Sequence, residues 1–461
     1  MKIYHEALET RLQAVAKAGF AEVTEAVKDL FGRSSPESLS AINAMRFARE
    51  RNLPALRTLR AFLMLTHEGV FDLSWQVHCP HCRGSNQSAA SLSDIRQSSH
   101  CPACAADYDA SFDQNLHLAF RAAPAVADLG EPDPFLEALA GMEFEGTILF
   151  ALEPGDRRFI ERELSPGYYL ALDHDHRNAL NIEVQASASD EAAAAGAAAA
   201  AGKASGKPGR FLWKLGQEVP PLTLSRQPAG MLRLLMQNDA PFSREIRFSR
   251  LRKPDWPDAA LVSTLREFRN FFSDQALGPQ ESFEIRNLAI LFTDIKGSTA
   301  MYERLGDATA FRIVKEHFGI MDGLVAARDG AMIKTIGDAV MAAFHRPLDA
   351  LAAASDMIDA FDRYNNDKGT GDEVIIKIGV HAGPCIAVNL NDRIDYFGTT
   401  VNIAARIQGL SDGRDIMVSR RLHEEAAAAG TLVDGLWSSE GFLAELKGIE
   451  EAQEVVKLAR A

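Results

Sequence analysis

Two aspartates in the C-terminal half of the chain lie where a carboxylate is costly unless something neutralises it. Asp294 follows the apolar run LAILF, which predicts a strand buried on both faces, with only Thr293 between them. Asp338 lies in a Gly-Asp step flanked by apolar residues, as in a β-hairpin turn. If adjacent strands bring the two acids side by side, they repel each other unless a cation lies between them. The pair therefore indicates a site for Mg²⁺ or Mn²⁺, which prefer hard oxygen ligands.

A turn of small residues follows Asp294 directly. Gly297, Ser298 and Thr299 can offer backbone N–H groups at the start of the next helix, which is a favourable place for a phosphate. The structural alternative is that Asp294 is a helix N-cap and Asp338 a turn residue, without any ligand. The two acids and the glycine turn together favour a site for a metal ion and phosphates.

A second group of candidate ligands lies in the N-terminal half. Two motifs, HCPHC at 78–82 and HCPAC at 100–104, place eighteen residues between two Cys-x2-Cys pairs. Four thiolates in this spacing suit a tetrahedral structural Zn²⁺; rubredoxin-like iron and a reversible dithiol switch are the alternatives. The expected zinc ligands are Cys79, Cys82, Cys101 and Cys104.

The overall composition limits the possible partners. The formal net charge of −14 and the pI of about 5.4 argue against nucleic acid, which needs a basic surface. We find no apolar run of the roughly 18–20 residues that cross a bilayer, and the N-terminus has charges where a signal peptide needs its apolar core. These features predict a cytoplasmic protein with neither nucleic-acid nor membrane partners.

The elements that must position these residues fall into five segments. We expect a helical segment over 1–75, a zinc ribbon over 76–112, and a linker over 256–285 with an amphipathic helix at 258–277. Alternating apolar residues over 113–255 predict an antiparallel β-rich, sandwich-like domain, interrupted by an Ala/Gly-rich insertion at 186–209. Residues 286–461 alternate strand and helix patterns, as in a catalytic domain.

Four motifs in this last segment carry a family resemblance. In order and spacing, the segment resembles the class III nucleotidyl cyclase catalytic domain through FTDIKGST, KTIGDAVMAAF, DYFGTTVNIAAR and LKGIEEAQEVVKL. The resemblance implies an α+β fold with a ferredoxin-like β-α-β-β-α-β core. It also implies an adenylate cyclase that converts ATP to 3′,5′-cyclic AMP and pyrophosphate. Two divalent ions per active site are then expected at Asp294, Ile295 and Asp338.

The same resemblance assigns the remaining site residues. Lys334 and Asp395 match the base-reading positions, and their donor and acceptor suit adenine, whereas guanylate cyclases of the family carry an acid in place of Lys334. Asn402 is expected to orient the ribose and Arg406 to stabilise the pentavalent phosphorus. Lys447 is expected on the terminal phosphates. A guanylate cyclase and a non-catalytic ATP-sensing scaffold are the alternatives.

Assembly follows from the family's shared sites. In the family the metal acids come from one catalytic domain and the other site residues from a second, so this chain is expected to form a homodimer with shared active sites. The segment 384–395 is shorter than the dimer arm of many members and lacks its glycine-rich run. The N-terminal half resembles a little-characterised bacterial regulatory module, with an unknown small ligand or protein partner.

The four-cysteine motif gives a first testable prediction. Chelation of zinc is expected to destabilise or unfold the N-terminal half, because the binding energy of a structural metal is folding energy. Thermal melting before and after treatment measures the effect. An unchanged melting curve after confirmed loss of metal would argue against a structural site.

Overall fold

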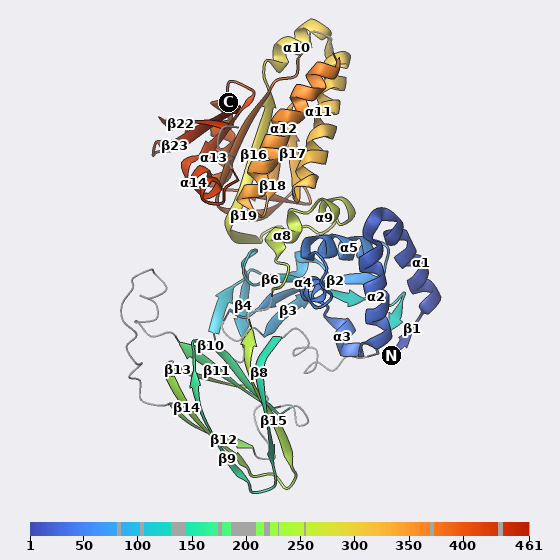
Figure 1. Ribbon diagram of the computed structural model, residues 1–461, viewed down its shortest axis with the longest axis vertical. Coiled ribbons are helices and arrows are strands. Elements are labelled where there is room, and N and C mark those ends of the chain that lie inside the picture. Colours follow the sequence, from blue (N-terminus) through green and yellow to red (C-terminus); the bar gives the residue numbers. More distant parts are fainter. Residues whose placement is uncertain are drawn as a thin grey trace.

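The protein extends along one long axis in the computed structural model, with the C-terminal sheet at one end and a β-rich region at the other (Figure 1). The N-terminal helices and a small sheet lie between these two ends. None of the described helices is long and apolar enough to span a membrane. The structure describes residues 1–80, 84–101, 106–130, 143–173, 178–185, 209–215, 222–228, 230–252, 255–368, 373–431 and 437–460.

The first part of the chain is helical, as the sequence predicted. Ser35 caps the third helix by accepting a hydrogen bond from the Ser38 N–H at 3.4 Å, with Pro36 in the first turn. Gly19, at φ 98°, bends the chain between the first two helices. The helical elements are α1 (His5–Val15), the π-helical turn η1 (Ala16–Phe20), α2 (Ala21–Arg33), α3 (Pro36–Ser40), α4 (Ala44–Glu50) and α5 (Ala55–His67).

A three-stranded sheet packs under α5, in the order β3-β2-β6. Phe62 of α5 stacks on Phe71 with ring centroids 4.9 Å apart and meets Phe120 edge-on at 5.1 Å, which fixes helix to sheet through aromatic contacts. The strands of this part, with one 3₁₀ turn, are β1 (Lys2–Ile3), β2 (Phe71–His78), β3 (Ser85–Ala89), η2 (Leu92–Asp94), β4 (Ser98–Cys101), β5 (Ala106–Asp109), β6 (Leu116–Ala122) and β7 (Ala127–Asp128).

The predicted zinc ribbon is described only in part. Cys79 follows β2 and Cys101 ends β4, and both are buried together in one small cluster. Cys82 and Cys104 lie outside the described residues. Within the described part of the chain, no three His, Cys, Asp or Glu side chains are grouped as metal ligands. The four-cysteine zinc site therefore stays a prediction.

The β-rich region forms two sheets around a shared apolar core, in the orders β13-β11-β10-β15-β8 and β12-β14-β9. The prediction of an antiparallel, sandwich-like domain is confirmed in part: four strand pairs are antiparallel, but β11 pairs with β13, and β12 with β14, in parallel. The chain alternates between the two sheets from β11 to β14. Strands β11 and β13 therefore run in the same direction in one sheet, and β12 and β14 do so in the other. The strands are β8 (Glu143–Leu152), β9 (Arg157–Leu164), β10 (Gly167–Asp173), β11 (Asn178–Gln185), β12 (Gly209–Leu215), β13 (Leu222–Pro228), β14 (Gly230–Asn238) and β15 (Arg244–Arg252). Of the predicted insertion at 186–209, residues 186–208 lie outside the described residues.

The linker differs from the single helix predicted at 258–277. It forms two short helices, α8 (Ala259–Ser263) and α9 (Arg266–Phe271), because Leu265 is extended at ψ 134° and Thr264 bonds back to the Leu261 carbonyl at 2.8 Å. This break lets Val262, Leu265 and Phe268 all be buried in the N-terminal core. A single straight helix would follow the apolar periodicity but not the shape of this core.

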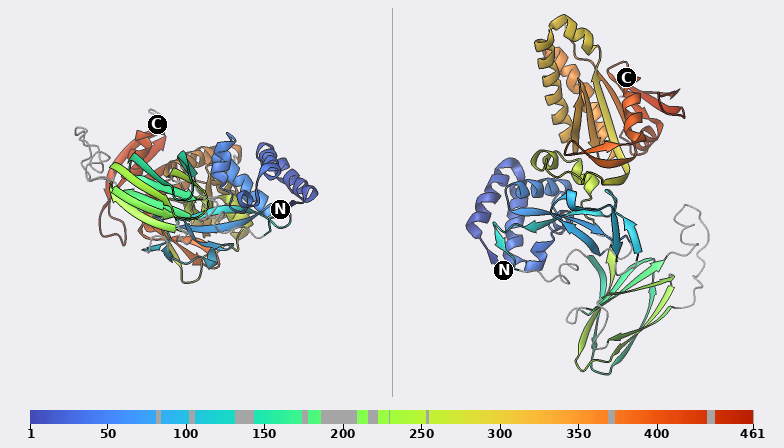
Figure 2. Two further views of the ribbon diagram at one scale, coloured as in Figure 1. Left: turned by 90° about the horizontal axis from the view of Figure 1, so that it is seen from below. Right: turned by 180° about the vertical axis from the view of Figure 1, so that it is seen from behind.

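The C-terminal sheet has the strand order that the ferredoxin-like prediction requires. Its order is β17-β18-β16-β19-β21-β23-β22, with β20 paired to β19, and helices α11 and α12 cover one face (Figure 2). The strands are β16 (Ser282–Ile295), β17 (Gly330–Ile336), β18 (Ala339–Phe344), β19 (Ile376–Leu390), β20 (Arg393–Phe397), β21 (Asp415–Ser419), β22 (Trp437–Ala444) and β23 (Gln453–Arg460). The helices are α10 (Ser298–Leu305), α11 (Asp307–Ala327), α12 (Pro347–Lys368), α13 (Thr399–Gly409) and α14 (Arg420–Ala428).

Strand β16 is buried on both faces, as its apolar run predicted. Leu288 and Ile290 belong to the cluster that contains the N-terminal helices, whereas Ala289 and Leu291 belong to the cluster under α11 and α12. The strand therefore joins two cores. Packing on both faces therefore fixes the position of its last residues, at one end of the sheet.

Helix α13 approaches the sheet most closely at Gly379 of β19. A Cβ atom there would lie 2.4 Å from the backbone nitrogen of Gln408. We expect Gly379→Ala to lower the free energy of unfolding by about 1–3 kcal/mol, because the helix backbone must move away. Urea denaturation measures this. The matched control is Gly409→Ala, whose Cβ meets nothing within 4 Å; a similar loss in both variants would contradict the close-approach explanation.

Candidate active site

The two predicted metal-binding acids are neighbours. Asp294 lies near the end of β16, which pairs antiparallel with β18, and Asp338 lies in the β17–β18 turn beside that end. Gly337 takes the left-handed conformation (φ 65°) that the tight turn requires. The Ile295 N–H donates to an Asp338 carboxylate oxygen at 3.3 Å. Strand pairing therefore places both acids at one end of the sheet.

The electrostatics of this pair suit the binding of a divalent cation. Burial, followed by the nearby Asp338 carboxylate, raises the pKa of Asp294 to about 6. Burial lowers the pKa of His317 to about 4, so that ring is neutral at pH 7 and supplies no charge. Within the described residues neither acid forms an ion pair. The nearby Lys377 ammonium lowers the pKa of Asp294 only in part. Two half-buried carboxylates are a suitable donor set for Mg²⁺ or Mn²⁺, which often complete their shell with phosphate and water.

The small-residue turn after Asp294 has the geometry that the sequence suggested. Gly297 is left-handed at φ 71° and precedes α10, so Ser298 and Thr299 form its first helical turn. The first N–H groups of a helix have no partner within the helix and favour anions. The turn therefore places backbone donors three to five residues beyond Asp294.

Lys334 and Asp395 form a direct ion pair. The Lys334 ammonium lies 2.6 Å from a carboxylate oxygen of Asp395, and the other oxygen accepts from the Tyr396 N–H at 2.8 Å. A register shift at Ile333 interrupts the pairing of β17 with β18 just before Lys334. Such bulges re-aim the side chains that follow them. The lysine also lies 5.3 Å from the centre of the Phe397 ring.

The last predicted residues lie on separate elements. Asn402 and Arg406 are exposed on one face of α13, while Ile403 and Ile407 bury the other face. Lys447 is exposed in the turn between β22 and β23. Among the described residues, no hydrogen bond or ion pair joins these three side chains to the two acids or to the Lys334–Asp395 pair. One chain thus presents the predicted residues as separate groups.

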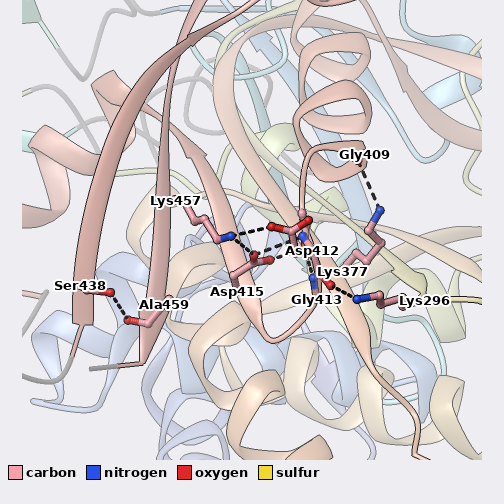
Figure 3. Close-up of polar contacts among 10 residues, drawn as sticks. Lys296, Lys377, Gly409, Asp412, Gly413, Asp415, Ser438, Lys457 and Ala459 are labelled. Carbon is pink, nitrogen blue, oxygen red and sulfur yellow. Dashed lines mark hydrogen bonds and ion pairs between the residues drawn. The ribbon is translucent and has the colours of Figure 1, made fainter.

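A lysine cluster beside the acids was not foreseen. Lys296, directly after the metal-site residues, donates to the Asp412 carbonyl at 2.7 Å, and Lys377, opposite Asp294 on β19, donates to the Gly409 carbonyl at 3.3 Å (Figure 3). These bonds tie the end of α13 to the strand ends that carry the acids. The only sequence signal was the position of Lys296 within the KGST turn.

Comparisons with known proteins find relatives of the C-terminal region. Residues 281–432 match the family described as the adenylate and guanylate cyclase catalytic domain, and residues 5–153 match a family of unknown function (DUF5939). The chain is similar to an adenylate cyclase of Anabaena cylindrica, with 31% identity over 38% of this chain and 37% of that protein. An adenylate cyclase of Lachancea kluyveri is 34% identical over 33% of this chain and 9% of its own length.

Among solved structures, the adenylyl cyclase CyaB from P. aeruginosa aligns over 39% of this chain and 97% of its own, at 19% identity and a TM-score of 0.35. The match covers 37% of the Anabaena protein and 9% of the Lachancea protein, so this chain spans only a minor part of either curated relative. Residues 281–432 are thus similar to the adenylate and guanylate cyclase catalytic domain, the family to which the motifs pointed.

The acid pair predicts an unusual pH dependence of stability. In the metal-free folded protein Asp294 stays protonated up to about pH 6, whereas an unfolded aspartate ionises at about pH 4. The stabilising contribution of the neutral form is therefore lost as pH rises from about 4 to about 6. We expect the melting temperature of wild type to fall relative to Asp294→Asn between pH 4.5 and 7.5, both measured with chelator.

Adding Mn²⁺ at pH 7.5 provides the control for this experiment. It is expected to raise the melting temperature of wild type more than that of the variant, because a neutral amide is a poorer ligand than a carboxylate. A constant difference between the two proteins across the pH range would contradict the raised pKa of Asp294.

Proposed function

We propose that the C-terminal domain converts ATP to 3′,5′-cyclic AMP and pyrophosphate. The observation that carries the proposal is the convergence of Asp294 and Asp338 beside a glycine turn, on a chain that also pairs Lys334 with Asp395. Asp294, Ile295 and Asp338 would hold two divalent ions. Bound there, Mg²⁺ or Mn²⁺ would lower the pKa of the ribose 3′-hydroxyl and neutralise triphosphate charge.

The chain's own residues would bind and orient the nucleotide. The N–H groups of the Gly297–Thr299 turn would contact phosphate oxygens, and the exposed Lys447 the terminal phosphates. Asn402 would orient the ribose for in-line attack on the α-phosphorus. The Arg406 guanidinium, one helical turn away, would bind the oxygens on which negative charge grows.

Base recognition supports ATP as the substrate. Lys334 can donate to a ring nitrogen of adenine, and Asp395 can accept from its exocyclic amine. Guanine presents an acceptor at O6 and a donor at N1, which is the opposite pattern. Because the matching family includes both adenylate and guanylate cyclases, GTP is the alternative substrate.

We also infer a two-fold homodimer with shared sites. Asn402 and Arg406 lie on an exposed face, and within the described residues they do not bond to the acids of their own chain. Large apolar side chains are exposed near the acids and near α13: Ile336, two residues before Asp338, is 54% exposed, and Phe397, two residues before α13, is 43% exposed. A second copy that covers these side chains would bring its metal acids to the α13 residues of the first.

For the N-terminal half we propose regulation of the cyclase. Its helices and small sheet share one apolar cluster with the catalytic domain, so a change in one is transmitted to the other by packing. We further propose that Cys79, Cys82, Cys101 and Cys104 hold a structural Zn²⁺, which the burial of Cys79 and Cys101 in one cluster supports. The signal could be a small ligand or a partner protein.

Mixing two inactive variants tests the proposed enzyme and its assembly together. Asp294→Ala and Arg406→Ala are each expected to lose cyclic AMP formation in an assay with Mn²⁺ and ATP. In randomly exchanged dimers half are mixed and each mixed dimer has one intact site, so about a quarter of wild-type activity should return.

The control mixes Asp294→Ala with Asp338→Ala, which should restore nothing because both changes lie in the metal half. Recovery in the control, or none in the test pair, would contradict shared sites. Wild type is assayed with ATP and GTP in parallel. More cyclic GMP than cyclic AMP would favour a guanylate cyclase, and the absence of both products would favour the ATP-sensing scaffold.

A further inference from the structure

Two linker residues form hydrogen bonds with Ile394 and Tyr396, the residues before and after Asp395 in the sequence. On one side, Nη1 of Arg269 donates to the Ile394 carbonyl at 3.1 Å. On the other side, the Tyr396 hydroxyl donates to Oγ of Ser263 at 2.8 Å. Ile394 and Tyr396 are both buried, and the Tyr396 side chain is fully so. The predicted base-reading carboxylate therefore lies between two points that are anchored from outside the catalytic domain.

Arg269 joins these two points through one rigid group. Its Nε donates to the Ser263 carbonyl at 2.8 Å, and its guanidinium carbon lies 5.6 Å from the centre of the Tyr396 ring. A guanidinium holds its donors in a fixed planar fork, so the bonds to Ser263 and Ile394 set each other's direction. A lysine at this position has one ammonium and cannot keep both bonds in that geometry.

The hydrogen bonds from the linker are an important part of the support of strand β20. Among the described strands it pairs only with β19, and the two-residue turn Asn391–Asp392 that joins them has both residues at positive φ. Beyond this strand pair, Arg269 and Ser263 of the linker form the hydrogen bonds at Ile394 and Tyr396. The position of Asp395 is therefore set by one strand, by Lys334 and by the linker.

We propose that Arg269 is a positioning residue that sets the discrimination between adenine and guanine by holding β20, and with it Asp395, in register with Lys334. The proposal rests on the proposed function. Arg269 precedes residues 281–432, which match the catalytic domain family, so part of the specificity would lie in the linker. Loss of the fork lets β20 shift. The Asp395 carboxylate then moves with the strand and no longer meets the exocyclic amine of adenine in the right geometry.

The test compares two arginines of the same helix. Arg269→Lys keeps the charge and loses the fork, and a cavity of about 110 Å³ beside Arg269 leaves room for the new side chain. Arg266→Lys is the matched control, since Arg266 forms a partly exposed ion pair with Asp322 on α11 at 2.9 Å. We expect Arg269→Lys to raise the KM for ATP about tenfold and to lower the preference for ATP over GTP by a similar factor, with kcat changed less than about threefold.

Two further measurements separate positioning from simple destabilisation. Tyr396→Phe, which removes the hydroxyl that bonds to Ser263 and keeps the Arg269 fork, is expected to shift the ATP:GTP ratio in the same direction by a smaller factor. Melting temperatures of all variants are measured in parallel. An unchanged ATP:GTP ratio in Arg269→Lys, or an equal loss of kcat with both nucleotides, overturns the proposal. So does an equal shift in the Arg266→Lys control.

The outcome for wild type distinguishes this proposal from the proposed function. If wild type forms no cyclic nucleotide, the proposed enzyme activity fails, but the role of Arg269 is still measured by binding. Dissociation constants of non-hydrolysable ATP and GTP analogues are then compared. A fall in the ATP preference in Arg269→Lys supports positioning, and an unchanged ratio overturns it.

Discussion

The burial of β16 on both faces is the constraint on which the candidate site depends. Alternate side chains of this strand enter two different cores, so a shift by one residue would exchange the faces of the whole strand. Because its register is fixed in this way, the strand end has little freedom. Asp294 therefore lies beside the Asp338 turn at a defined place. Packing elsewhere in the domain holds the two carboxylates close together although they repel each other.

Around this strand, the site is divided among elements with different supports. The acids and the glycine turn belong to the central strands, whereas Asp395 lies on β20, which has a single strand partner. Asn402 and Arg406 lie on α13, which is held to the sheet by the close approach at Gly379 and by the lysine cluster beneath its end. The most rigid part of the domain thus carries the expected metal ligands, and the part tied to the linker carries the expected base reader.

The sequence was informative where a single local rule determined the structure. The apolar run before Asp294 predicted a strand buried on both faces, and the Gly-Asp step predicted the hairpin turn; both are present. The helical N-terminal segment was predicted for the same reason. The family motifs then supplied the pairing of Lys334 with Asp395, which lies beyond local rules because 61 residues separate them.

Prediction failed where distant parts of the chain decide the local structure. The apolar periodicity of 258–277 suggested one helix, but burial of Leu265 in the N-terminal core breaks it in two. Alternation of β11 to β14 between two sheets leaves no mark on strand periodicity, so the parallel pairs were missed. The bonds of Ser263 and Arg269 to β20 span more than a hundred residues, and neither residue belongs to a recognisable motif.

The apolar cluster that contains the N-terminal helices also contains Tyr396, Phe283 and one face of β16. Sequence comparison divides the chain near residue 281, but this cluster continues across that position. A chain cut there would leave the catalytic sheet with an apolar face open to water. The packed unit is therefore larger than the unit that the family model recognises.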